Sequence, residues 1–260
     1  MINSLVATIS PTTPAAPVAG YKAWYDAADT ATISKTGSSV TQWNDKSANA
    51  LHLVQATGTK QPQSGTRTQN GKNMIDFDGT NDVLSSNASV GSWQFLTNST
   101  GTTVFLVMFA DTAADNRSIF DCSDGSVANV PSYSWVINPG DTIFAGVGTN
   151  NPGTYNWLAA AASSVTDNTA QQIAIVSDTS NATAANRGLI YKNGTLAWNS
   201  NTYTGTASAS NPSQPLNVGG YVNYSESFDG GICEILIYNS ILSGADITKN
   251  SNYLAAKWGL

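Results

Sequence analysis

Two nearly uninterrupted apolar runs constrain this chain more than any other feature: residues 102–110 (TTVFLVMFA) and residues 232–238 (ICEILIY). Both runs are rich in β-branched and aromatic residues, which favour extended backbone. A strand with one face in water alternates apolar and polar residues, and neither run does so. The sequence therefore predicts two central strands of a sheet, with residues 171–177 (QQIAIVS) as a third inner strand.

Turn signals divide the rest of the chain into short strands. Asn193-Gly194 separates two β-forming runs and predicts a two-residue hairpin. Gly219-Gly220 and residues 228–231 (FDGG) mark further turns. Strand follows strand without the regular helices of β-α units, and no internal repeat occurs. We therefore expect an all-β sandwich.

One short helix is predicted at the C-terminal end. Ser243 is a suitable N-cap, and Asp246 takes the acidic position of a capping box. Ile247, Leu254 and Trp258 then fall on one helical face. We expect this face to pack on the sandwich.

The first nineteen residues differ from the rest in composition. Residues 1–19 are rich in Pro, Thr and Ala and should form an extended arm or linker without a core of its own. Residues 20–260 then form one domain. The arm is expected to anchor the protein to sister subunits or to other proteins of a larger particle. Its apolar anchoring residues would be Met1, Ile2, Leu5, Val6 and Ile9.

Charge and hydropathy exclude several classes of protein. The net charge is -6, and the 11 Lys and Arg residues are scattered, which argues against binding to nucleic acid. No apolar run is long enough to cross a membrane. The N-terminus lacks the basic and apolar regions of a secretory signal. Cys122 and Cys233 are far apart without metal-ligand spacing, and a disulfide between them is not favoured.

Several motifs together carry a family resemblance. They are residues 23–29 (AWYDAAD) with residues 42–47 (QWNDKS), residues 75–84 (IDFDGTNDVL), and the stretch 216–260, which runs from LNVGG through FDGGICEILIYN to YLAAKWGL. With these motifs, residues 20–260 resemble the concanavalin A-like (laminin-G-like) lectin/glucanase domains. The resemblance implies a jelly-roll β-sandwich with a C-terminal helix. It implies function poorly, because this fold hosts unrelated activities.

The residues that catalysis would need are scarce. Glycoside hydrolysis uses two carboxylates, and the Glu-x-Asp-x-x-Glu motif of the glucanase relatives is absent here. Of the two glutamates, Glu226 lies in a polar loop. Glu234 lies within ICEILIY, where related binding domains also have Glu, which implies a structural role. His52 is the only histidine, and no nucleophile is marked near it. We expect no enzymatic activity, although a pair of Asp residues leaves a hydrolase as the third alternative.

Three aspartates allow two interpretations. Asp76, Asp78 and Asp82 lie in DFDGTND, where alternation and the turn bring their side chains near one another. Hard oxygen ligands of this kind suit calcium. The favoured alternative is that these are turn residues whose side chains bond the local backbone. No other cofactor is expected.

Aromatic residues beside amides in the loops point to sugar contacts. Apolar sugar faces stack on aromatic rings, and sugar hydroxyls need fixed polar partners. The candidate carbohydrate-binding residues are Tyr155, Trp157, Asn201, Tyr203, Tyr221 and Tyr224.

The first functional hypothesis is a non-enzymatic structural or decoration protein on a virion surface, in the capsid or in a tail or fibre. It would have a lectin-like fold and a capacity for binding glycans. The chain from Met1, the missing export signal and the arm favour this virion location. The alternative is a carbohydrate-binding module or adhesin of a bacterial cell surface.

Overall fold

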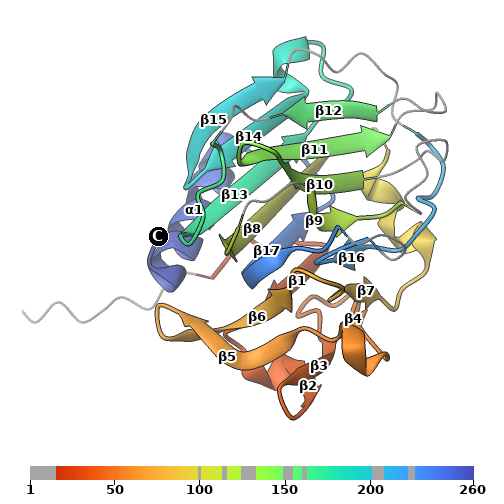
Figure 1. Ribbon diagram of the computed structural model, residues 1–260. Helices are drawn as coiled ribbons and strands as arrows, with labels where there is room; N and C mark the ends of the chain where they lie inside the picture. The colour runs from red at the N-terminus through yellow and green to blue at the C-terminus, as the bar shows by residue number, and fades with distance from the viewer. Residues whose placement is uncertain are drawn as a thin grey trace, which may run out of the picture.

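The computed structural model describes residues 16–98, 101–112, 116–123, 133–148, 155–159, 163–200, 208–221 and 226–260. Within these residues, seventeen strands join in one continuous hydrogen-bonded sheet, which folds over into two layers (Figure 1). The short 3-10 helices between strands are η1 (Thr30–Thr32), η2 (Gly58–Lys60), η3 (Val90–Leu96) and η4 (Ala184–Asn186). The predicted all-β sandwich with a C-terminal helix is confirmed.

The predicted apolar runs form the centre of the back layer. β17 (Asp229–Tyr238) pairs with β8 (Thr102–Ala110), and β8 pairs on its other side with β13 (Ala170–Ser177). The outer strands of this layer are β14 (Gly188–Lys192), β15 (Thr195–Ser200), β1 (Ala23–Asp26), β6 (Lys72–Asp78) and β5 (Gln63–Gln69). Asn193 (φ 48°) and Gly194 (φ 80°) connect β14 to β15 as the predicted two-residue hairpin.

The front layer consists of two groups of consecutive short strands, which two further strands join. Their spatial order is β12 (Tyr155–Ala159), β11 (Thr142–Gly148), β10 (Tyr133–Asn138), β9 (Arg117–Asp121), β16 (Asn217–Val218), β7 (Leu84–Ser86), β4 (Leu53–Val54), β3 (Ser39–Trp43) and β2 (Ile33–Thr36). The two groups are β9–β12 and β2–β4, and β16 and β7 join them. Ser39 of β3 pairs with Gln63 of β5, which joins the two layers.

Side chains along β8 alternate between two cores. Val104 and Leu106 belong to the core between the layers, whereas Phe105 and Val107 pack in the cluster that holds the helix α1 (Gly244–Trp258). Because successive side chains of a strand point to opposite faces, a strand covered on both faces must be apolar throughout. This explains the uninterrupted run that the sequence shows.

Helix α1 begins and packs as predicted. The Ser243 hydroxyl accepts a hydrogen bond from the Asp246 N–H at 3.1 Å and donates one to the Asp246 carboxylate at 2.8 Å. Ile247, Leu254 and Trp258 are buried against the back layer. No helix in the described part of the chain has both the length and the apolar character needed to span a membrane.

The end of the predicted arm is attached to the sandwich. The Val18 N–H donates to Asn250 Oδ1 at 2.8 Å, and the Val18 carbonyl accepts from the Tyr238 hydroxyl at 2.6 Å. The anchoring residues proposed for the arm lie outside the described residues: Met1, Ile2, Leu5, Val6 and Ile9.

Candidate functional site

The outer face of the front layer carries a row of neighbouring positions that crosses the sheet from β3 to β11 (Figure 1). The residues next to row positions along three of the strands point into the core between the layers: Trp43, Val218 and Trp135. Because successive side chains of a strand point to opposite faces, the side chains of the row point outward. Strand register aligns the positions in this order: Gln42, Val54, Ser85, Asn217, Asp121, Ser134 and Gly146. These seven positions are called the outer-face row. The outer face of the back layer, by contrast, is covered by α1.

The centre of the row consists of hydrogen-bonded polar side chains. Asn217 and Asp121 are fully buried, and Ser85 beside them is half-buried. The Ser85 hydroxyl donates to Asn217 Oδ1 at 2.6 Å. The Asp121 carboxylate accepts from the N–H and the hydroxyl of Ser123 at 2.7 and 2.9 Å. Satisfied buried networks hold their members in one orientation, so Ser85 presents its hydroxyl oxygen from a fixed position.

Aromatic side chains border the row beside β10 and β11. The Tyr221 hydroxyl lies 3.4 Å from Ser134 Oγ, and the Tyr221 side chain is half-buried. Phe144 of β11 is also half-buried and lies opposite Val136 of β10. A partly exposed ring on the same face as a fixed, partly exposed hydroxyl group is chemistry that sugar recognition uses.

Two of the predicted sugar-binding residues lie at the β12 edge of this face. The backbone of Trp157 pairs with Gly146, the last position of the row, and that of Tyr155 pairs with Gly148. The structure thus brings these two positions and Tyr221 to one layer. The other predicted contacts lie outside the described residues: Asn201, Tyr203 and Tyr224.

Sequence reasoning missed the polar centre of the site. Asp121 and Ser134 come from the consecutive strands β9 and β10, but Asn217 comes from β16, which follows much later in the chain, so no local motif unites the three. The only sequence signal is that each alternates with apolar residues in a short strand. That pattern predicts an outward position but does not identify the neighbouring strand.

The three aspartates considered for calcium take separate roles. Asp76 pairs with Arg67 at 2.8 Å. Asp78 Oδ1 accepts the N–H groups of Asn81 and Asp82 at 3.1 and 3.3 Å, and Asp82 Oδ2 accepts the Asp78 N–H at 3.1 Å. This is the local turn bonding of the favoured interpretation. Among the described residues, no three His, Cys, Asp or Glu side chains are grouped to hold a metal ion. Calcium binding here stays a prediction.

We expect Asp82→Asn to stabilise the protein at pH 7 but not at pH 4. Desolvation, followed by the charge of Asp78, raises the pKa of Asp82 to about 6. The unfolded carboxyl titrates near pH ~3.9. Between these values the native state retains a proton that the unfolded state has released, so the free energy of unfolding falls as pH rises. Melting temperatures of both proteins across pH 4–7 measure the difference. A difference that does not grow with pH would contradict this expectation. A calcium-induced rise in the wild type that the variant lacks would support the calcium site.

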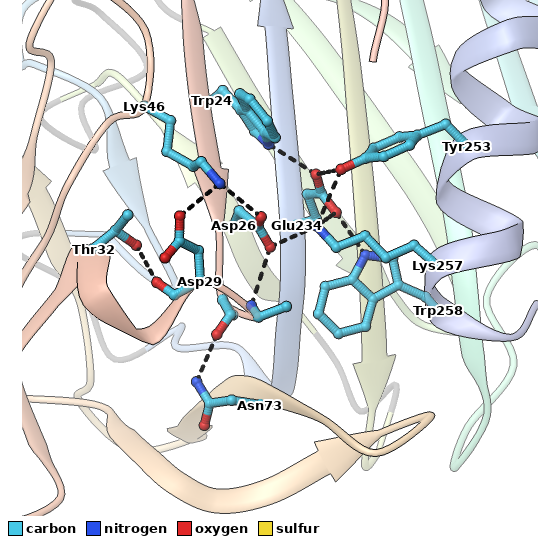
Figure 2. A network of polar contacts seen from close by, with 12 residues as sticks. Trp24, Asp26, Asp29, Thr32, Lys46, Asn73, Glu234, Tyr253, Lys257 and Trp258 are labelled. Carbon is cyan, nitrogen blue, oxygen red and sulfur yellow. Dashed lines mark hydrogen bonds and ion pairs between the residues drawn. The ribbon is translucent and has the colours of Figure 1, made fainter. Parts of the chain in front are cut away.

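The most strongly bonded carboxylate belongs to Glu234 of β17 (Figure 2). Its Oε1 accepts hydrogen bonds from Trp24 Nε1 and the Tyr253 hydroxyl, both at 2.8 Å. Its Oε2 accepts one from Trp258 Nε1 at 2.7 Å and pairs with Lys257 at 2.7 Å. Burial raises the pKa of Glu234, although Lys257 acts in the opposite direction.

The Glu234 network joins three parts of the fold. Lys257 of α1 also pairs with Asp26 of β1 at 2.7 Å, and Asp26 pairs with Lys46 at 3.1 Å. Asp26 and Glu234 are register partners, but Glu234 is fully buried and both its oxygens are occupied. The arrangement is that of a structural clamp that holds α1 on the back layer, as the sequence implied for Glu234.

The single histidine has a structural contact. His52 Nδ1 accepts the N–H of Asp45 at 3.1 Å. The Asp45 carboxylate accepts the N–H groups of Trp24, Ser47 and Leu51 at 2.9, 2.8 and 3.0 Å. These bonds fix the segment between β3 and β4. Cys122 and Cys233 are free, buried thiols.

Comparisons with known proteins agree with this architecture. A family model described as the concanavalin A-like lectin/glucanases superfamily matches residues 77–248. Comparison with curated protein sequences gives no significant match.

Solved structures with this fold include domains of carbohydrate-active proteins. Domain 4 of AbnA, an extracellular arabinanase from Geobacillus stearothermophilus solved with arabinotriose, has a TM-score of 0.59 and 12% identity; the match covers 89% of this chain and 98% of that one. The CBM40 of a Ruminococcus gnavus sialidase, bound to α2,3-sialyllactose, has a TM-score of 0.53 and 11% identity, with 67% and 94% covered. The NanB sialidase of Streptococcus pneumoniae has a TM-score of 0.51 and 13% identity. Its match covers 67% of this chain and only 27% of the sialidase. At these identities the likeness concerns the fold alone.

Proposed function

This chain belongs to the concanavalin A-like lectin/glucanases superfamily, and we propose that it is a non-catalytic carbohydrate-binding domain. The observation that carries the proposal is the outer-face row with half-buried Tyr221 beside it. The Ser85 hydroxyl in this row is partly exposed and is held by its hydrogen bond to Asn217, whereas Asn217 and Asp121 are fully buried and support this surface without reaching a ligand. A preorganised polar surface of this kind loses little entropy when a sugar binds.

A role without catalysis is part of the proposal. Hydrolysis of a glycosidic bond needs two carboxylates on either side of that bond. Both oxygens of Glu234 are occupied inside the protein. Glu226 is the only other glutamate of the chain. These arrangements support binding over turnover.

The carbohydrate-binding alternative now has more support than the virion hypothesis. The solved structures with this fold that are described above are a carbohydrate-binding module and domains of a sialidase and an arabinanase. They support a module that binds glycans. A virion location, and assembly through the arm of residues 1–19, remain predictions that anchorage experiments would test.

Tyr221→Ala and Trp157→Ala are expected to weaken glycan binding by about tenfold or more, because a stacked ring contributes about 1.4 kcal/mol or more at the centre of such a site. A glycan array on the full chain would identify a ligand, and calorimetry would compare the variants. Leu196→Ala is the matched control, because Leu196 is an exposed apolar residue of β15 in the back layer. A blank array, or binding that survives both aromatic substitutions, would count against this face.

A further inference from the structure

We propose that the outer-face row binds neutral glycans and disfavours acidic ones such as sialic and uronic acids. The inference rests on the proposed function and adds the chemical class of the ligand. A protein that selects an acidic sugar offers the sugar carboxylate a cation, most effectively the planar fork of an arginine. The relevant question is therefore where the cations of this chain lie.

The structure describes every lysine and arginine of the chain. All 11 lysines and arginines lie among the described residues. The segments outside the described residues therefore contain neither lysine nor arginine, and these segments include residues 124–132, 149–154, 201–207 and 222–225. The one histidine, His52, accepts a hydrogen bond within its own loop. Among the described loops, Lys60 of η2 lies beside the β7 part of the row, because its carbonyl accepts the N–H of Val83, two residues before Ser85.

Most cations are already committed to partners away from the row. Four are paired with carboxylates: Lys46, Arg67, Lys249 and Lys257. Five donate hydrogen bonds to residues that do not belong to the row: Lys22, Lys35, Arg117, Arg187 and Lys192. Of the remaining two, Lys60 ends η2, and Lys72 begins β6 in the back layer.

Arg117 is the one cation on the strands that carry the centre of the row. It lies four residues before Asp121 on β9, which at ~3.3 Å per residue places its Cα about 13 Å away. Its Nη1 donates to the carbonyls of Gly79 and Ser227 at 2.7 and 3.1 Å. Charges beyond the Debye length of ~8 Å are largely screened at physiological salt.

The charge that does lie in the row is negative. Asp121 is fully buried, so its charge is screened less than that of a surface residue. Because Asp121 has no exposed surface, it acts on a ligand through its charge and not through contact, and it repels a sugar carboxylate but not a neutral sugar. The net charge of -6 has the same sign. The charge of Asp121 and the net charge of the protein therefore both favour neutral ligands over acidic ones.

An array of matched pairs tests the inference on the full chain. Lactose would stand beside α2,3-sialyllactose, and galactotriose beside trigalacturonate, with arabinotriose and xylotriose as further neutral probes. We expect the neutral member of a pair to bind at least about tenfold more tightly. Its affinity should not change between about 0.05 and 0.5 M salt. Asp121→Asn should reduce the difference in affinity between the neutral and the acidic member of a pair by several-fold. Asp246→Asn, in the first turn of α1 on the outer face of the back layer, should leave that difference unchanged.

Each outcome is informative. Tighter binding of the acidic member, weakened by salt, would overturn the inference while leaving carbohydrate binding intact. In that case, loss of binding in Arg117→Gln would identify the cation responsible. A blank array with every probe would overturn the proposed function, and the inference with it. The melting temperature of Asp121→Asn shows whether this variant folds. If it does not fold, the affinities of the wild-type protein for each neutral and acidic pair, and their salt dependence, still test the inference.

Discussion

Replacing Glu234 by glutamine is expected to lower the free energy of unfolding by about 3 kcal/mol, because removing one partner of a buried ion pair leaves the other uncompensated. Glu234 accepts from Trp24, Tyr253 and Trp258 and pairs with Lys257. A glutamine keeps the shape but turns one oxygen into an NH₂ group, which faces donors instead of accepting from them. The cost combines a lost charge pair with unsatisfied buried donors.

Glu226→Gln provides the matched control, because it changes the only other glutamate in the same way. Glu226 accepts no side-chain hydrogen bond in the described structure, and its pKa is raised by desolvation alone. We therefore expect its unfolding midpoint in urea to stay close to that of the wild type. Urea unfolding followed by tryptophan fluorescence compares the three proteins. Equal stability of the two variants would show that the clamp contributes nothing to holding α1.

Gly219→Ala is expected to destabilise the protein by about 3 kcal/mol or more. Gly219 has φ 90°, a conformation that costs a residue with a Cβ about 1–2 kcal/mol. An alanine Cβ would lie 2.1 Å from Cε1 of Phe77. Phe77 is itself buried and packs edge to face with Phe228, so its ring has no space to move. Overpacking of this kind costs a further ~1–3 kcal/mol.

The neighbouring glycine is the natural control. At Gly220 a Cβ would approach no atom more closely than 3.3 Å, and its φ lies outside the left-handed region. Gly220→Ala should therefore cost much less. Thermal melts of both variants measure the difference. Variants with equal melting temperatures would contradict the steric argument.

The sequence predicted the strands with the greatest certainty where burial is two-sided. Residues 104–110 of β8 are all apolar, and residues 232–238 of β17 are apolar except for Glu234, so their pattern differs from that of an exposed strand. Local rules also sufficed at Asn193-Gly194 and at Ser243, because a tight turn and a helix cap each depend on a few adjacent residues. Among the site residues, Tyr221 was found in this way, as an aromatic residue beside a turn.

Only the tertiary structure decided the composition of the candidate site, because the site depends on which strands become neighbours. The row joins Ser85, Asn217, Asp121 and Ser134 only through strand register, and no local pattern specifies the register between distant segments. The role of Asp76 likewise depended on tertiary structure. Asp76 pairs with Arg67 of β5, so it does not share the turn bonding of Asp78 and Asp82. The sequence by itself determined a two-layer sandwich, its central strands and its capped helix. The fold determined which polar residues share a face, since that face is assembled from segments that are far apart in the chain.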